Sequence, residues 1–342
     1  MKHVFWIHNH TTYLTAKGVI EKLKLPSKDI VFVLARNYKC FDLGDEIPAY
    51  DMSDIVMSPI TESKRHVADE VEKIDKFLNE KVGEVFTFYI PHLCAYIYQV
   101  FLTHKLCADI KFIQEGIIDC CTGGSVSSMS LRSRLKQLYL NTTYRGWRRF
   151  WKAAGWDDYK YGVKHASETF SITDSLFNKA DCKHTIVEWP KMTLPISLEN
   201  DGVYFVFESL VEQRNIEKEV FLEASGKLIM KFGSIHNYVK FHPAQKDENK
   251  GYIKSLFSKN GFHVEQLPDN VPFEMILANQ PHMKVCGFTT SLVFFAALMP
   301  QHEAHICVPA LYKSKRFIRK SWKNFESNLK RCYGDRFMYE EL

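Results

Sequence analysis

Short apolar runs alternate with longer amphipathic stretches along the first third of the chain. The runs are rich in β-branched and aromatic residues, as buried strands are, and the stretches between them have helical spacing. Strands that alternate with helices predict a parallel sheet covered by helices on both faces. The first helix is expected to have Thr11 or Thr12 as its N-cap. The predicted strands are Val4–Ile7, Ile30–Ala35, Val85–Ile90 and Ile110–Ile113, and the predicted helices are Thr11–Leu23, Ser63–Asn79 and Leu93–Thr103.

A second alternating series begins near Ser167 and ends before a basic, aromatic tail. Its predicted strands are Phe170–Thr173, Val203–Phe207, Tyr238–Phe241, Met283–Cys286 and Ile306–Val308, and its predicted helices are Ile216–Phe232, Phe273–Ala278 and Leu292–Leu298. The chain is therefore expected to be α/β, with two Rossmann-like domains and a cleft between them. The expected divisions are residues 1–165, residues 166–314 and a helical tail, residues 315–342.

Composition supports this division and narrows the setting. The 342 residues suit two domains, and 46% hydrophobic residues are enough for two cores. Nine cysteines without a C-x-x-C pair favour a reducing compartment. The start of the chain does not read as a signal peptide, and no apolar run is as long as the roughly 18 residues of a membrane span. We therefore expect a cytoplasmic protein.

The positive charge is modest, at +5 overall, but it is concentrated in two regions. Residues 132–164 mix basic and aromatic residues, and the tail adds further lysines and arginines. Two interpretations stay open: a peripheral contact with the anionic inner membrane, or a solvated basic face. Nucleic acid is not an expected partner, because no recognition motif accompanies the charge.

Ligands of parallel α/β sheets bind beyond the carboxyl ends of the strands, so the loops that follow strands carry the candidate chemistry. The first group of residues in these loops is expected to face an acceptor, although polar loop residues without a role would look the same. These candidates are His8, Asn9, His10 and Asn37. The other loops to inspect are Arg36–Asn37, Pro91–His92, Gln114–Glu115–Gly116, His242–Pro243 and Thr289–Thr290–Ser291.

Two of these loops offer acid–base chemistry. His242 ends a predicted strand, and Pro243 biases it towards an extended conformation, so its imidazole is placed to donate to a leaving phosphate. Glu115 also follows a strand, and Gly116 lets a substrate approach closely, so its carboxylate is placed to deprotonate a hydroxyl. Each could instead be an ordinary turn residue.

Two helix starts offer binding groups. Thr289, Thr290 and Ser291 open a helix, where hydroxyls and free N–H groups form an anion site or simply cap the helix. Glu274 lies in the first turn of another helix, where it could bind the two hydroxyls of a ribose or only favour the helix dipole.

Taken in order, these short motifs resemble those of the bacterial GT-B sialyltransferases, including the lipooligosaccharide and capsular polysialyltransferase groups. Those families share an acidic D/E-D/E-G motif, an HP motif and a Ser/Thr-rich motif, with a ribose-binding Glu between the last two. The matching positions here are Gln114–Glu115–Gly116, His242–Pro243, Glu274 and Thr289–Thr290–Ser291. The chain departs from the pattern at Gln114, which leaves Glu115 as the carboxylate of the first motif.

The resemblance implies a function and a role for each position. Glu115 would be the general base, His242 would bond the departing CMP phosphate, and the donor would be held by Pro243, Glu274, Thr289, Thr290 and Ser291. The implied reaction is inverting, metal-independent transfer of a nonulosonic acid (sialic, pseudaminic or legionaminic acid) from a CMP donor to a capsule or lipooligosaccharide acceptor.

Several expectations accompany this reaction, and two alternatives stay open beside it. No cofactor and no metal is expected, since the chain lacks a D-x-D pair and His302–Glu303–Ala304–His305 has the wrong spacing for a zinc motif. One alternative is the same fold with another donor, such as CMP-Kdo or a nucleotide diphosphate sugar. The other is a non-catalytic protein that binds glycan or nucleic acid.

Overall fold

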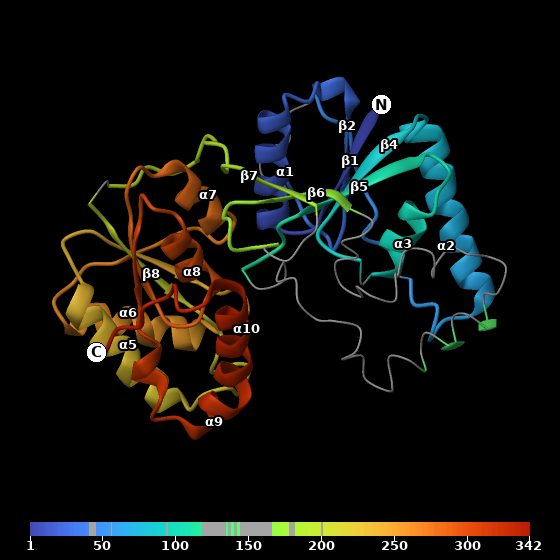
Figure 1. Cartoon of the computed structure of the whole chain (residues 1–342). Helices are drawn as coiled ribbons and strands as arrows, with labels where there is room; N and C mark the ends of the chain where they lie inside the picture. The colour runs from blue at the N-terminus through green and yellow to red at the C-terminus, as the bar shows by residue number, and fades with distance from the viewer. Residues whose placement is uncertain are drawn as a thin grey trace. The chain divides into compact units, whose positions relative to one another are not determined.

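The computed structural model divides the chain into two α/β units, Met1–Trp189 and Pro190–Leu342 (Figure 1). The structure describes residues 1–40, 46–55, 57–93, 95–117, 135, 138–139, 142–143, 166–177, 182–199 and 201–342. The basic stretch at residues 132–164 therefore lies almost entirely outside the described residues. No helix in the described ranges has both the length and the apolar character needed to cross a bilayer.

The first unit is built on a parallel sheet whose central strands are apolar on both faces. Within the described residues its strand order is β3-β2-β1-β4-β5-β6-β7. Parallel strands covered on both sides need continuous apolar runs, and Phe5 on β1 accordingly stacks on Tyr89 of β4 at 4.0 Å between ring centroids. The strands are β1 (Lys2–Ile7), β2 (Ile30–Leu34), β3 (Ala49–Asp51), β4 (Phe86–Ile90), β5 (Cys107–Ile113), β6 (Ala166–Ser171) and β7 (Lys183–Ile186).

Helices cover both faces of this sheet, with α1 (His10–Leu23) on one side and α2 (Lys64–Phe77) and α3 (Tyr96–Leu102) on the other (Figure 1). Ser63 caps α2. The prediction of Thr11 or Thr12 as the cap of α1 was wrong, because Asn9 is the N-cap and its side chain accepts from the Thr12 N–H. Asn is among the strongest N-caps, and its choice starts the helix one residue earlier.

The boundary between the units was predicted to follow residue 165, and in the structure it follows Trp189. Strands β6 and β7 both belong to the first sheet, where β6 pairs with β5 and β7 with β6. Beyond them, the Trp189 Nε1–H donates to Thr15 Oγ1 of α1 at 3.3 Å. The run at Phe170 therefore completes the first unit, and the chain passes to the second unit only after Trp189.

The second unit has a five-stranded parallel sheet in the order β10-β9-β8-β11-β12. The chain builds outward from β8 to β10 and then returns to the other side of β8 with β11, so the order reverses between β8 and β11. Its strands are β8 (Val203–Phe207), β9 (Asn237–Phe241), β10 (Glu265–Gln266), β11 (Lys284–Gly287) and β12 (Glu303–Ile306). Its helices include α5 (Lys218–Phe232), α6 (Asp247–Lys259), α7 (Phe273–Asn279) and α8 (Ser291–Leu298).

Residues 315–342 are part of the second unit and not a separate tail, which corrects the third predicted division. They form α9 (Lys315–Phe317), a π-helical turn η6 (Ile318–Trp322) and α10 (Lys323–Tyr333). Phe317 and Trp322 are buried, and the Glu340 N–H donates to the Ile306 carbonyl at 2.9 Å, beside the last strand. Apolar anchors therefore fix the segment, whose basic residues are on the surface.

Candidate functional site

Four polar residues follow four neighbouring strands of the first sheet. His8 follows β1, Arg36 follows β2, His92 follows β4, and Glu115 follows β5. Because the carboxyl ends of parallel strands share one edge of the sheet, residues far apart in sequence meet there.

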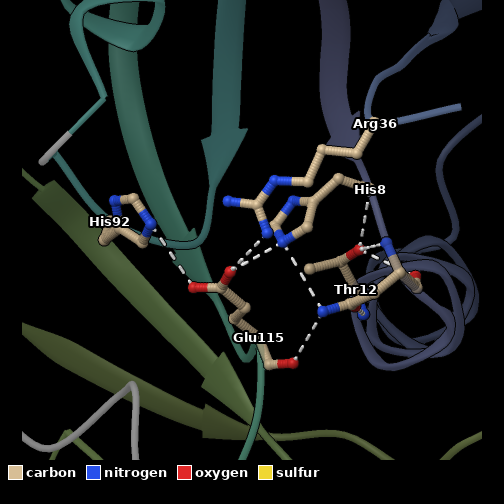
Figure 2. Close-up of polar contacts among 6 residues, drawn as sticks. His8, Thr12, Arg36, His92 and Glu115 are labelled. Atoms are coloured by element: carbon tan, nitrogen blue, oxygen red, sulfur yellow. Dashed lines mark hydrogen bonds and ion pairs between the residues drawn. The ribbon is translucent and has the colours of Figure 1, made fainter. Parts of the chain in front are cut away.

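Glu115 is the centre of this group (Figure 2). Its Oε1 accepts from His8 Nε2 at 2.7 Å and lies 3.7 Å from an Arg36 guanidinium nitrogen, while its Oε2 lies 3.4 Å from His92 Nε2. The Glu115 side chain is 11% exposed and that of His8 is fully buried. Since a carboxylate can only accept, the His8 Nε2–H is the donor. The site therefore presents one partly accessible carboxylate among three nitrogen donors.

These donors decide the protonation state of Glu115. Burial, the largest single influence, acts to raise the pKa of Glu115, but the hydrogen bond from His8 and the charges on His92, His8 and Arg36 together outweigh it and lower the pKa below its ordinary value. Glu115 is therefore ionised at neutral pH, which is the state that a general base requires.

The cap of α1 fixes the backbone of Glu115 as well. Asn9 accepts from the Thr12 N–H at 2.8 Å through Oδ1, and its Nδ2 donates to the Glu115 carbonyl at 3.2 Å. Thr12 completes the capping box by accepting from the Asn9 N–H at 3.3 Å. The start of α1 and the end of β5 are thereby held together, with the carboxylate of Glu115 beside His8.

Gln114, where the motif departs from the family pattern, has a structural role. Its side chain is fully buried; Oε1 accepts from the Ile172 N–H at 3.0 Å and Nε2 donates to the Gly116 carbonyl at 3.3 Å. An amide supplies both a donor and an acceptor for these backbone groups, which a carboxylate cannot do. In this chain the first motif position ties β5 to β6, and the second position alone carries the carboxylate.

The predicted acceptor-side residues separate into two pairs. His8 and Asn9 contact Glu115, as described above. His10 instead bonds the Tyr38 hydroxyl at 3.0 Å, and Asn37 donates its backbone N–H to Ser53 Oγ at 2.7 Å. Arg36 and His92 had not been singled out as site residues, although both lie in loops that follow strands, and that position was the available signal.

In the second unit, His242 lies at the end of β9 as predicted. Its backbone N–H donates to the Phe207 carbonyl at 2.9 Å, and its Nδ1 accepts from the Ala244 N–H at 3.1 Å. A neutral ring therefore carries its proton on Nε2. Burial of the ring lowers the pKa of His242, and the Glu212 carboxylate, which acts to raise it, does not compensate. An exposed residue with a neutral Nε2–H donor results, followed by the exposed Pro243.

Lys240, two residues before His242, braces the loop that leads to Glu274. Its buried ammonium donates to the carbonyls of Pro268 at 2.6 Å and Val271 at 2.8 Å. Burial lowers the pKa of Lys240, and burial likewise raises the pKa of Glu274, where the Lys240 charge acts in the opposite direction. Strand β9 and the loop that precedes α7 are thus linked through one side chain.

The predicted Ser/Thr motif lies at the start of α8. Thr290 is the N-cap, with its Oγ1 accepting from the Leu292 N–H at 3.4 Å, and the exposed Ser291 is the first helical residue. Thr289 has a different part: its N–H and its hydroxyl both donate to Glu208 Oε1, at 2.6 and 2.5 Å. Both donors of Thr289 therefore bond a protein carboxyl, so only Thr290 and Ser291 of the motif present hydroxyls at the helix start.

A glycine sets the approach of this turn. A Cβ on Gly287 would lie 2.8 Å from Val206 Cγ2 and 2.9 Å from the Val206 carbonyl oxygen. Both distances are too short for a real side chain, so glycine is required where β11 runs past β8. The close approach brings the turn after β11 against Glu208, the residue that follows β8.

Comparisons with known proteins identify the fold. No family model matches the chain, and no curated protein matches it by sequence. A 2,6-sialyltransferase from a Photobacterium species, solved in a ternary complex with donor product CMP and acceptor substrate lactose, has a TM-score of 0.51 and 12% identity over 88% of this chain and 71% of that one. A sialyltransferase from Photobacterium damsela gives 0.50 and 12% over 99% and 81%.

The chain has the GT-B fold. A UDP-GlcNAc 2-epimerase from Methanocaldococcus jannaschii is also similar, with a TM-score of 0.49 and 11% identity over 96% of this chain and 98% of that one. The predicted pair of Rossmann-like α/β domains is confirmed.

Within this GT-B chain each unit supplies one kind of chemistry. The first unit holds an ionised carboxylate, Glu115, that can take a proton from a hydroxyl. The second unit holds a neutral N–H donor, His242, and the start of α8, both of which suit a phosphate. Among the described residues no group of histidine, cysteine and carboxylate side chains is arranged to hold a metal ion.

Proposed function

We propose that this protein is an inverting, metal-independent glycosyltransferase that moves a nonulosonic acid from a CMP donor to a cell-surface glycan of the capsule or lipooligosaccharide type. Sialic, pseudaminic and legionaminic acid are the proposed donor sugars, since all three carry the anomeric carboxylate that the resemblance implies. The GT-B fold supports a nucleotide-sugar enzyme.

The observation that carries this proposal is the state of Glu115. In the proposed reaction Glu115 accepts the proton of the acceptor hydroxyl while the oxygen attacks the anomeric carbon. His8, His92 and Arg36 keep Glu115 ionised. Of its two histidine contacts, that of Oε2 with His92 Nε2, at 3.4 Å, is longer than that of Oε1 with His8 Nε2, at 2.7 Å. A single displacement from the face opposite the leaving group inverts the anomeric centre.

The leaving phosphate is assigned to the second unit. In the proposed reaction the His242 Nε2–H donates to a phosphate oxygen, and Thr290 and Ser291 bind the same group at the start of α8. Glu274 binds the ribose hydroxyls. These donors stabilise the charge that develops as CMP departs, without a metal ion.

The CMP part of the donor is supported by the order of the motifs and by one similar structure. The Photobacterium 2,6-sialyltransferase was solved with CMP and lactose, and its fold is that of this chain. A donor of another class on the same fold, CMP-Kdo or a nucleotide diphosphate sugar, is the alternative that experiment must separate. A non-catalytic protein that binds glycan or nucleic acid is the remaining alternative.

The donor is tested by incubating the protein with a set of CMP-nonulosonic acids, in the presence and absence of EDTA, and measuring CMP release. Release that persists in EDTA is the expected result. A thermal-shift panel of CMP, UDP and GDP runs in parallel, and stabilisation by UDP or GDP alone would reassign the donor. Binding of nucleic acid with a steep salt dependence, without donor turnover, would reassign the class.

The donor half is tested by His242→Asn, with His236→Asn as its control. His236 is an exposed histidine that precedes β9, at the strand end away from the site. Loss of a hydrogen bond to the leaving phosphate should lower turnover by about 10²–10³-fold, and His236→Asn should leave it unchanged. Equal turnover in both variants would remove His242 from the mechanism.

A peripheral contact with an anionic membrane is proposed as a secondary partner. Two basic residues at or just before the C-terminal segment already pair with carboxylates at α5: Lys313 with Glu223 of α5 at 2.6 Å, and Arg316 with Glu217, the N-cap of α5, at 3.9 Å. The contact would use the exposed side chains of Arg319, Lys320 and Lys323. Co-sedimentation with vesicles of anionic lipid, but not with neutral vesicles, is the expected result.

A further inference from the structure

Glu208 is a buried carboxyl at the point where the order of the second sheet reverses. It directly follows β8, whose neighbours are β9 and β11. In the ladder Phe207 pairs with Phe241, and Val206 pairs with Gly287, so Glu208 emerges beside His242 on one side and the turn at Thr289 on the other. This is the place in an open α/β sheet where ligands bind.

The two oxygens of Glu208 have different surroundings. Oε1 accepts from both the N–H and the hydroxyl of Thr289, whereas Oε2 is buried without a hydrogen-bond partner among the described residues. The residue is only 8% exposed. A buried polar atom is normally satisfied, so an unpartnered oxygen at a ligand-binding edge indicates that a ligand, a water or a proton belongs there.

The charges around Glu208 do not favour its ionised form. Burial, the largest influence, raises the pKa of Glu208, and the hydrogen bonds from Thr289 and from its own backbone lower it without compensating. No cationic side chain in the described ranges forms an ion pair with it. Two titratable groups flank Glu208 along the fold: His242, which follows β9 and bonds the Phe207 carbonyl, and Glu212, in the same loop as Glu208.

The start of α8 is the second component of this arrangement. Thr290 and Ser291 present hydroxyls there, together with first-turn N–H groups that have no partner within the helix itself, of which that of Leu292 bonds Thr290 Oγ1. Thr289 connects these residues to Glu208, because both of its donors end on Oε1. The orientation of the helix start is thereby set by a carboxyl group whose other oxygen is unpartnered.

We propose that Glu208 is a positioning residue of the phosphate subsite: as a neutral acid it holds the turn Thr289–Ser291 in place, and a phosphate group binds at the start of α8 only while Glu208 keeps its proton. The inference rests on the proposed function in taking the phosphate to be that of the nucleotide donor. The proton resides on Oε2, since Oε1 already accepts two hydrogen bonds. An ionised Glu208 would place negative charge beside the bound phosphate.

A competing arrangement makes a different prediction. Glu208 could remain ionised and itself occupy the helix start as an internal anion, with which the phosphate has to compete. Removing its charge would then tighten phosphate binding at every pH. If Glu208 is instead neutral when phosphate binds, a side chain that cannot ionise changes phosphate affinity only at the pH values where Glu208 would lose its proton.

The test is the pH dependence of CMP affinity, measured by calorimetry between about pH 5 and pH 9 for the wild type and for Glu208→Gln. Gln keeps an oxygen acceptor for Thr289 and does not titrate. The wild type should lose affinity above the ionisation of Glu208, by up to about tenfold per pH unit. The variant should match the wild type at the acidic end and exceed it at the alkaline end. His242 and the CMP phosphate titrate in both proteins, so the difference isolates Glu208.

Two further variants complete the design. Glu265→Gln, an exposed carboxyl on β10 of the same unit, should follow the wild type at every pH. Thr289→Val removes the hydroxyl donor to Oε1 but keeps the backbone donor, and should weaken CMP binding at acidic pH. Identical pH profiles for the wild type and Glu208→Gln, or tighter binding by Glu208→Gln even at the acidic end, would overturn the inference.

Failure of the inference and failure of the proposed function give different results. Turnover of a CMP-nonulosonic acid with identical pH profiles of binding leaves the function intact and removes Glu208 from the phosphate subsite. The opposite result is that CMP or inorganic phosphate binds with the expected loss of affinity at alkaline pH, that Glu208→Gln removes this loss, and that no CMP-nonulosonic acid is turned over. It leaves the inference intact and removes the proposed reaction. A protein that binds neither CMP nor phosphate contradicts both.

Discussion

The two units each place a glutamate at the carboxyl end of a central strand, and the two carboxyls have opposite surroundings. Glu115 in the first unit is 11% exposed and contacts two histidines and one arginine. Glu208 in the second unit is 8% exposed, and its hydrogen-bond donors in the described ranges, on Thr289 and on its own backbone, carry no charge. The pKa is lowered at Glu115 and raised at Glu208.

Burial alone does not explain this difference, because it acts to raise the pKa of both groups. The sign is decided by whether cationic side chains converge on the carboxyl. His8, Arg36 and His92 follow three different strands, so parallel-sheet topology brings them to Glu115. Two carboxyls whose pKa values are shifted in opposite directions suit opposite tasks: Glu115 accepts a proton, and Glu208, by the inference above, tolerates a neighbouring anion.

The largest expected effect is on turnover at Glu115. Glu115→Gln preserves the shape of the side chain and its acceptor for His8 but removes the basic carboxylate. Turnover of the donor with an acceptor should fall by about 10²–10⁴-fold, while CMP affinity should not change, because CMP is assigned to the second unit. Initial rates of CMP release and calorimetric CMP binding measure the two quantities.

The matched control for this prediction is Glu84→Gln. Glu84 is an exposed glutamate that precedes β4, at the strand end away from the site, and it contacts only the N-terminal amine at 3.7 Å in the described structure. Its substitution should leave turnover at the wild-type level. A Glu115→Gln protein as active as Glu84→Gln would show that the carboxylate is not the base.

The next effect is on stability at Glu208. Glu208→Ala removes the acceptor of two buried donors, the N–H and the hydroxyl of Thr289, and should lower the free energy of unfolding by about 2–4 kcal/mol. Glu208→Gln keeps an acceptor and should cost much less. Urea denaturation compares the two variants. Equal losses would indicate that packing, and not the bonds to Thr289, explains the role of Glu208.

Much of this architecture is predictable from the sequence because buried parallel strands are continuous apolar runs. Val203–Phe207 was predicted with the bounds that β8 has, and Ile30–Ala35 differs from β2 by one residue. The missed strands are polar or very short and lie at or near sheet edges, where no continuous run is needed: β3, β7 and β10. Helix α6 was missed because its buried positions form a narrow stripe, Asn249, Ile253 and Phe257, in a polar segment.

The candidate site was predictable in part for a related reason. Glu115 and His242 follow apolar strands, and parallel-sheet topology places such positions at the edge where ligands bind. Their contacts were not predictable, since His8 and Glu115 are 107 residues apart and meet only through strand pairing. Glu208 was missed because in the sequence it resembles any solvated residue after a strand, and its burial and its bonds to Thr289 arise only in the folded chain.

A third prediction is that Glu208 and Glu115 contribute to the free energy of unfolding with opposite pH dependences. A carboxyl with a raised pKa stabilises the fold fully below its unfolded value of 4.5, and this contribution is lost as pH rises through the folded value, as expected for Glu208. A carboxyl with a lowered pKa stabilises the fold above 4.5, and this contribution is lost as pH falls through the folded value, as expected for Glu115.

The measurement is the difference in unfolding free energy between the wild type and each Glu→Gln variant as a function of pH. For Glu208→Gln this difference should decrease as the pH rises above 4.5. For Glu115→Gln it should decrease as the pH is lowered below 4.5. Each slope is limited to about 1.4 kcal/mol per pH unit, the value for one proton. Slopes of the same sign for both variants would contradict the contrast between the two environments.

The smallest effect concerns Arg36, the weakest of the contacts to Glu115. Arg36 and Asn37 both have left-handed backbone, with φ of 57° and 56°, in a turn closed by the Tyr38 N–H and the Ala35 carbonyl at 3.1 Å. Arginine in this conformation costs about 1–2 kcal/mol, and an ion pair at 3.7 Å whose arginine is 63% exposed returns at most about 1 kcal/mol. The turn therefore holds Arg36 near Glu115 at a small net loss of stability.

Replacing either turn residue by glycine separates the backbone from the charge. Arg36→Gly and Asn37→Gly should both leave the free energy of unfolding within about 1 kcal/mol of the wild type, because glycine adopts left-handed backbone without strain. Only Arg36→Gly removes a cation from Glu115, so it alone should move the acidic limb of the pH–rate profile upward, by less than about one pH unit. If Asn37→Gly shifts that limb equally, the turn acts through its geometry; if neither does, the two histidines alone keep Glu115 ionised.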